Sequence, residues 1–203
     1  MSRYVGPRIK LMRALGIDLP GLSRKSVEQR NYPPGQHGQK QRRRSNFANQ
    51  LLEKQKLRVN YGVTERQLRR LFAEARQSKT PTGDKLVELL ERRLDNVVFR
   101  AGFAPTIPAA RQLVSHRHVR VNGLAVNIPS YRVRIGDRIE VREKSRSLAV
   151  VSESLNEPAL ARPEWITWNE TAGYAQVGHL PAADNVPFPV ELQQVVEYYS
   201  NRI

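Results

Sequence analysis

Apolar residues recur at steps of three and four between residues 84 and 101, which is the spacing of one face of an α-helix. The stripe consists of Leu86, Leu89, Leu90, Leu94, Val97, Val98 and Ala101. This pattern predicts a single amphipathic helix over residues 84–101 that ends at Gly102. Beyond a turn marked by prolines, a shorter helix over residues 109–115 is expected to pack on the first, with Arg111 facing outward.

Alternating apolar and polar residues follow, with the two-residue period of a β-strand. Residues 118–121 alternate immediately before Asn122-Gly123, a dipeptide favoured in tight hairpin turns because both positions take positive φ. A second alternation over residues 132–142 contains a Gly-Asp turn and would place its arginines on one face of a sheet. We therefore expect two helices packed on a short antiparallel sheet.

Two further helices are predicted ahead of this module. Residues 51–59 form one that breaks near Gly62, and Thr64 begins the next through a capping box in which Thr64 and Gln67 exchange hydrogen bonds. One face of the second helix is apolar, and the other faces carry Arg66, Arg69, Arg70 and Arg76. Side chains on such a ridge lie about 5–6 Å apart and can follow consecutive phosphates, although a solvated helix surface is the ordinary alternative.

The two ends of the chain differ in character. Residues 1–45 have little apolar content beyond a short helix that ends at Gly16, so we expect an extended basic arm that folds on RNA or remains a disordered basic tail. Residues 147–155 and 191–199 read as helices, with an irregular stretch around Trp165, Ile166 and Trp168 between them. The predicted organisation is α+β: an arm (1–45), a helical domain (46–93 plus 156–203) and an inserted RNA-binding module (94–155).

The charge of the chain points to a polyanionic partner. Lysine and arginine number 34 against 19 acidic residues, a net charge of +15. Residues 1–80 hold 19 basic and 5 acidic residues, whereas residues 151–203 hold 2 and 7, so the excess lies toward the N-terminus. Because no apolar run approaches the ~18 residues of a spanning helix and no signal peptide is evident, we expect a soluble, intracellular protein without a membrane partner.

The sequence offers little for catalysis or metal binding. It contains no cysteine and no phosphate-binding GxxxxGK[ST] loop, and its acids around residue 90 have arginine neighbours that favour salt pairing. His116 and His118 could share one face of a strand, but no third ligand is near and Arg117 would repel a cation. We therefore predict no enzyme activity, no cofactor and no metal, and expect both imidazoles to contact RNA.

Several blocks resemble one family throughout the chain. RLDNVVFRAGF, ARQLVSHRHVRVNG and NIPSYRVRIGDRIEVRE are similar to the core of the small-subunit ribosomal protein S-four family. YPPGQHGQ (32–39), LLEKQKLRVNYGVTERQLRRLF (51–72) and VVEYYSNR (195–202) resemble other blocks of the same proteins in the same order. Residues 164–189 depart from the family pattern.

The resemblance implies a structural constituent of the small ribosomal subunit that binds a junction in the five-prime domain of its rRNA and nucleates assembly. It further implies contacts with messenger RNA where it enters the subunit, with ribosomal protein S-five and with S-three, a role in translational accuracy, and a location in the bacterial cytoplasm or the plastid stroma. Some family members carry a four-cysteine zinc site, and the absence of thiols here predicts none.

The candidate interface residues follow from the charge pattern and the resemblance together. For rRNA they are Arg3, Arg8, Lys10, Arg13, His37, Lys54, Lys56, Arg58, Arg69, Arg70, Arg92, Arg93, Arg111, His116, Arg117, His118, Arg120, Asn122, Arg132 and Arg134. For messenger RNA they are Lys40, Arg42, Arg43 and Arg44, of which Lys40 and Arg43 fall on basic positions of the family. A charge run of this kind can also be a localisation signal.

Two other functions remain compatible with the module. An RNA-modifying enzyme could carry it, but the residues after 150 are too few for a catalytic domain. A free RNA-binding regulator of translation would differ by sedimenting away from ribosomal subunits.

Overall fold

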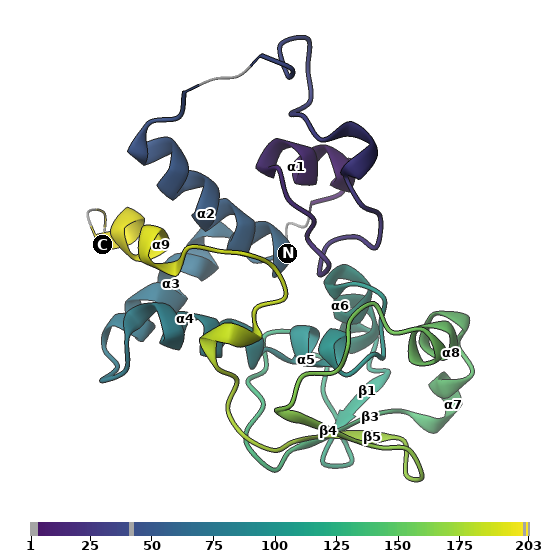
Figure 1. Ribbon diagram of the computed structural model, residues 1–203. Coiled ribbons are helices and arrows are strands. Elements are labelled where there is room, and N and C mark those ends of the chain that lie inside the picture. The colour runs from purple at the N-terminus through teal and green to yellow at the C-terminus, as the bar shows by residue number, and fades with distance from the viewer. Residues whose placement is uncertain (1–3, 41–42, 201, 203) are drawn as a thin grey trace. The chain divides into compact units, whose positions relative to one another are not determined.

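The chain forms two compact units (Figure 1). In the computed structural model, residues 4–40, 43–200 and 202 are described. The terminal unit joins Met1–Leu86 to Val186–Ile203, and the central unit comprises Val87–Asn185. Each unit has its own buried apolar core.

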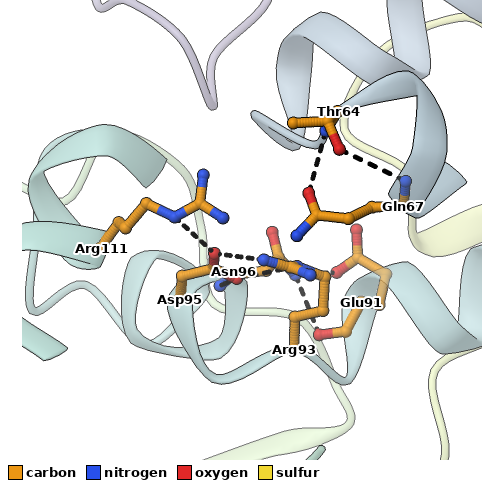
Figure 2. A network of polar contacts seen from close by, with 7 residues as sticks. All are labelled: Thr64, Gln67, Glu91, Arg93, Asp95, Asn96 and Arg111. Carbon is orange, nitrogen blue, oxygen red and sulfur yellow. Dashed lines mark hydrogen bonds and ion pairs between the residues drawn. The ribbon is translucent and has the colours of Figure 1, made fainter. Parts of the chain in front are cut away.

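Helices make up the terminal unit because its apolar residues follow helical spacing. They are α1 (Arg8–Leu15), the 3-10 turn η1 (Glu28–Arg30), α2 (Asn46–Asn60), α3 (Glu65–Arg76), the beginning of α4 (Thr82–Glu91) and α9 (Leu192–Ser200). The predicted capping box is confirmed: the Gln67 amide donates to the Thr64 hydroxyl at 3.3 Å, and the Thr64 amide donates to Gln67 Oε1 at 2.9 Å (Figure 2). The buried face of α3 packs Phe72 against Tyr199 of α9, with ring centroids 5.0 Å apart.

The N-terminal arm is folded, and the prediction of an extended arm is wrong for residues 17–31. Leu19 and Leu22 are buried, and the Gly21 amide donates to Asn60 Oδ1 at the end of α2, at 2.9 Å. The Asp18 carboxylate accepts hydrogen bonds from the Val27 amide and the Ser26 hydroxyl. The isolated apolar residues of this segment follow neither a helical nor a strand period, so the sequence alone does not indicate that they are buried. Their burial is evident only in the folded structure, where the segment contacts α2.

The central unit is an antiparallel sheet with helices, as the predicted α+β class requires. Its elements are α5 (Leu94–Arg100), α6 (Ile107–Ser115), β1 (Val119–Val121), β2 (Leu124–Ala125), β3 (Arg138–Val141), α7 (Glu143–Arg146), α8 (Ala149–Asn156), β4 (Ile166–Asn169), β5 (Tyr174–Val177) and the 3-10 turn η2 (Ala183–Asn185). The strand order is β2-β1-β3-β5-β4. Val119 and Ile139 on β1 and β3 are fully buried, and α5 and α6 lie on one side of the sheet (Figure 1).

The single helix predicted over residues 84–101 is two helices, α4 and α5. Arg93 between them is extended, with ψ of 137°, and forms a bridge with Arg132. The amides of Leu94 and Asp95 donate to the carbonyls of Tyr131 and Pro129, at 2.8 and 3.1 Å. The apolar spacing continues through the break, and every residue of α5 is buried, so periodicity alone could not show where one helix ends and the next begins.

The sheet extends beyond the predicted module. Residues 166–177, expected to be irregular, form β4 and β5, and Ala175 of β5 pairs with Ile139 of β3. Of the second predicted alternation only Arg138–Val141 is a strand, and Ile135 is exposed in the turn before it. Because β5 pairs onto β3, contacts within the central unit span residues 87–185, a wider range than 94–155.

Candidate nucleic-acid interface

The turn between α6 and β1 presents Arg117 to solvent in an unusual backbone conformation. Arg117 has φ of 61° and is exposed. Its amide donates to the Val114 carbonyl, and the His118 amide donates to the Leu113 carbonyl, both at 3.0 Å. These bonds make a Schellman motif with Arg117 at the left-handed position that glycine usually occupies. The fold therefore holds a charged side chain at a position where glycine would be less strained.

The hairpin tip is tied to the turn before β3 by a set of bonds that we call the hairpin clamp. Asn122 and Gly123 have φ of 52° and 80°, as the Asn-Gly pattern predicts. Asn122 Nδ2 donates to Asp137 Oδ1 at 2.8 Å, and Asn122 Oδ1 accepts from the Arg138 amide at 2.9 Å. Asp137 Oδ2 accepts from the Arg134 amide at 2.7 Å. The clamp fixes the backbone at two exposed arginines, Arg134 and Arg138.

A buried ionic network joins the start of α5 to α6 (Figure 2). Asp95 is fully buried, and Arg93 donates to both of its carboxylate oxygens, at 3.1 and 2.7 Å. Arg111 Nε lies 3.6 Å from the same carboxylate. Asn96 Nδ2 donates to Glu91 Oε2 at 2.8 Å. Because a buried carboxylate is costly without partners, these contacts hold the two helices in one arrangement.

Arg111 is therefore half-buried rather than turned outward as predicted. Burial lowers the pKa of its guanidinium, the charge of Asp95 raises that pKa, and the nearby charge of Arg93 lowers it again, for a net decrease. Arginine remains charged at neutral pH even so.

In the terminal unit, several candidate residues are engaged within the chain. Lys54 is buried and donates to Glu65 Oε2 at 2.8 Å, and Lys56 pairs with Glu53 at 2.6 Å. Arg13 donates to the carbonyls of Arg30 and Tyr32. The predicted ridge on α3 is exposed at Arg66, Arg69, Arg70 and Arg76. An open depression of about 470 Å³ is lined by Glu65, Arg66, Arg69, Arg70 and Ala73.

The two histidines lie close together at the end of α6. Their ring centroids are 6.1 Å apart, and His118 Nδ1 shares a hydrogen bond of 2.9 Å with the Ser145 hydroxyl. Within the described part of the chain no group of three or more His, Cys, Asp or Glu side chains could hold a metal ion. Among the same residues, no helix is long and apolar enough to cross a membrane.

Comparison with known proteins decides the family. Residues 3–91 match the "ribosomal protein S4/S9 N-terminal domain", and residues 92–139 match the "S4 domain". The chain is 65% identical over 205 residues to small ribosomal subunit protein uS4 of Methylobacillus flagellatus, with 100% of both chains covered. The chain belongs to the uS4 family.

Other relatives agree with this assignment. Protein uS4B of Nitrosomonas europaea is 60% identical over all of both chains, and uS4c of Cyanophora paradoxa is 50% identical over 98% of this chain and 100% of its own. The sequence resemblance is thereby confirmed. Since these uS4 relatives are ribosomal proteins, the prediction of a structural protein rather than an enzyme is confirmed as well.

The uS4 fold divides the candidate residues into two groups. Buried Lys54 and Arg93 are held in ion pairs, which gives them a structural part. Arg92 is half-buried, donates to the Val133 carbonyl and pairs with Glu88. The remaining candidates that the structure describes are wholly or partly exposed, among them Arg8, Lys10, His37, Arg58, Arg69, Arg70, His116, Arg117, Arg120, Asn122, Arg132 and Arg134.

The residues predicted to face messenger RNA are only partly described. Lys40, Arg43 and Arg44 are exposed, whereas Arg42, like Arg3 of the rRNA set, lies outside the described residues.

Sequence reasoning missed two features of the interface. Asp137 was visible only as a turn residue, although its carboxylate organises the hairpin clamp. Arg138 lies over the Tyr174 ring, with its guanidinium 5.2 Å from the ring centroid. The pairing of β3 with β5 brings Arg138 and Tyr174 together, and no local pattern in the sequence indicates that pairing.

Proposed function

We propose that this chain binds a folded junction in the five-prime domain of small-subunit rRNA and that this binding nucleates assembly of the subunit. Family membership supports an rRNA-binding part of the small ribosomal subunit. The observation that carries the proposal is the exposure of Arg117, in the turn between α6 and β1, and of Arg132 and Arg134, in the segment before β3. Arginine donates two parallel hydrogen bonds to a phosphate, which suits contacts with a folded RNA backbone.

The exposed ridge of α3 is proposed as a second contact with the same RNA. Arg66, Arg69 and Arg70 line one open depression on this helix. Contacts from two units would make affinity depend steeply on salt, because each phosphate that is neutralised releases counterions.

The test is a salt titration of binding to a transcript of the five-prime domain. Arg132→Ala/Arg134→Ala is expected to weaken binding and to lower the slope of log affinity against log salt by about two, one for each phosphate contact. Lys144→Ala/Arg146→Ala removes the same charge from exposed positions of the same unit that we place outside the interface. If the control pair lowers affinity and slope as much as the test pair, charge alone acts and the assigned interface is wrong.

We further propose that Lys40, Arg43 and Arg44 face messenger RNA in the channel by which it enters the subunit, that S-five and S-three are neighbours, and that the protein contributes to translational accuracy. The ribosome concerned would be of bacterial type, in the bacterial cytoplasm or the plastid stroma. Exposure of the three basic side chains supports the first point. Crosslinking from position 43 in assembled subunits is expected to reach messenger RNA, and crosslinks to rRNA alone would contradict it.

A further inference from the structure

The hairpin clamp holds the one Asn-Gly dipeptide of the sequence. Asn122 and Gly123 are both exposed at the tip of the β1–β2 hairpin. Asparagine followed by glycine is the dipeptide most open to attack on the side-chain amide, because glycine has no side chain to shield its backbone nitrogen. We propose that Asn122 is a site of spontaneous deamidation and that Asp137 controls its rate.

The reaction needs only water as co-reactant. The backbone nitrogen of Gly123 loses its proton and bonds to Cγ of Asn122, the Cγ–Nδ2 bond breaks, and Nδ2 takes up a proton and leaves as ammonia. The product is a five-membered succinimide. Water then opens either carbonyl of the ring, which yields aspartate or isoaspartate at position 122.

The clamp opposes this ring closure. Cγ of Asn122 must rotate toward the Gly123 nitrogen, but its amide nitrogen is bonded to Asp137 at 2.8 Å and its oxygen to the Arg138 amide at 2.9 Å. Both bonds must break first. Asp137 is 8% exposed and is also held by the Arg134 amide, so it does not follow the moving side chain.

Deamidation would also undo the clamp that restrains it. The new carboxylate at position 122 has no proton to donate to Asp137 and instead places a second negative charge beside it. The bond to the Arg138 amide can persist in an aspartate but not in an isoaspartate, whose longer backbone does not fit a two-residue turn. In the isoaspartate form the Arg138 backbone would lose this bond, whereas the Arg134 amide stays bonded to Asp137.

Mass spectrometry of the full chain incubated at mildly alkaline pH tests the site, and Asn127 is its internal control. Asn127 is exposed in the same unit but precedes Ile128, whose branched side chain hinders attack. In urea, deamidation at Asn122 is expected to be much faster than at Asn127. In the folded protein the rate at Asn122 should fall by roughly ten- to a hundredfold, because two hydrogen bonds must open.

Substitutions at Asp137 separate the effect of the clamp on the deamidation rate from the effect of folding in general. Asp137→Ala is expected to raise the rate at Asn122 and leave Asn127 unchanged. Asp137→Asn, whose single side-chain oxygen can accept only one of the two bonds, should restore part of the protection. If Asn122 reacts equally fast in folded and urea-unfolded protein, or never reacts in either, the proposal is overturned. This comparison holds even if Asp137→Ala does not fold.

The consequence for binding rests on the proposed function and is tested apart from the chemistry. Asn122→Asp is expected to weaken binding to the five-prime-domain transcript, and bound transcript should slow deamidation of the unmodified chain. Normal binding by Asn122→Asp would contradict the functional consequence while leaving the modification site intact. If Arg132→Ala/Arg134→Ala left the slope of log affinity against log salt unchanged, that result would instead contradict the assigned interface.

Discussion

Replacing Arg117 with glycine separates what this residue does for the fold from what it does for RNA. Arg117 occupies the left-handed position of a Schellman motif, with φ of 61°. An L-residue pays about 1–2 kcal/mol in that conformation. Glycine removes this strain but loses about 0.5–1 kcal/mol through the larger entropy of the unfolded chain. Arg117→Gly should therefore stabilise the protein by about 0.5–1 kcal/mol, which corresponds to a rise in Tm of roughly 1–4 °C.

The same substitution should weaken binding to the five-prime-domain transcript, because a charge at the proposed interface is lost. The slope of log affinity against log salt is expected to fall by about one. Arg117→Ala is the matched control, since it removes the charge but keeps a side chain at positive φ. It should weaken binding equally without raising Tm.

Two assays check this reasoning, thermal unfolding and the salt titration. A lower Tm for Arg117→Gly would show that the arginine side chain stabilises the turn and that the strain argument is wrong. Unchanged affinity and slope in both variants would remove Arg117 from the interface.

Further predictions concern the buried Asp95 network and the contacts of Glu65 with Lys54 and Tyr199. Asp95→Ala should destabilise the protein by about 3–5 kcal/mol in urea unfolding, because two arginines lose a buried partner. The control Lys144→Ala, at an exposed position, should leave the free energy of unfolding unchanged. A loss below about 1 kcal/mol for Asp95→Ala would contradict the network's role. Tyr199→Phe removes a 2.8 Å bond to the Glu65 carboxylate and should cost about 1.5–3 kcal/mol by the same assay. Burial raises the pKa of Glu65, but bonds from Lys54 and Tyr199 and the charges of Lys54 and Arg58 outweigh it and lower the pKa overall. The stabilisation that the Glu65 carboxylate gives the folded protein is therefore complete above the ordinary carboxyl pKa, and it is lost as the pH falls through the lowered pKa. Glu65→Gln should make the free energy of unfolding fall less steeply with decreasing pH in this acid range.

Local patterns in the sequence were sufficient for the helices of the terminal unit. The apolar face of α3 and its capping box depend on residues within a few positions of one another, and both form as predicted. The Asn-Gly turn after β1 is equally local. Each of these elements is determined by neighbours that the sequence places together.

Features that depend on distant partners could not be read in this way. The break between α4 and α5 exists because Arg93 pairs with Arg132, and β5 exists as a strand because β3 offers it an edge. The interface shows the same limit. A list of basic residues cannot distinguish Arg134, which is exposed, from Arg93, which forms an ion pair with a buried carboxylate.

The packing of α9 against α3 has a consequence for the order of events during synthesis. The terminal unit needs Tyr199 against Phe72 and Val195 in its core, so it cannot close until α9 has left the translating ribosome. The central unit has no such dependence on the C-terminus and can fold first while the chain is still growing. A nascent chain would thus carry a folded central unit before the terminal unit forms. A message truncated before residue 192 would yield a protein in which the apolar surface of α2 and α3 that α9 covers stays exposed.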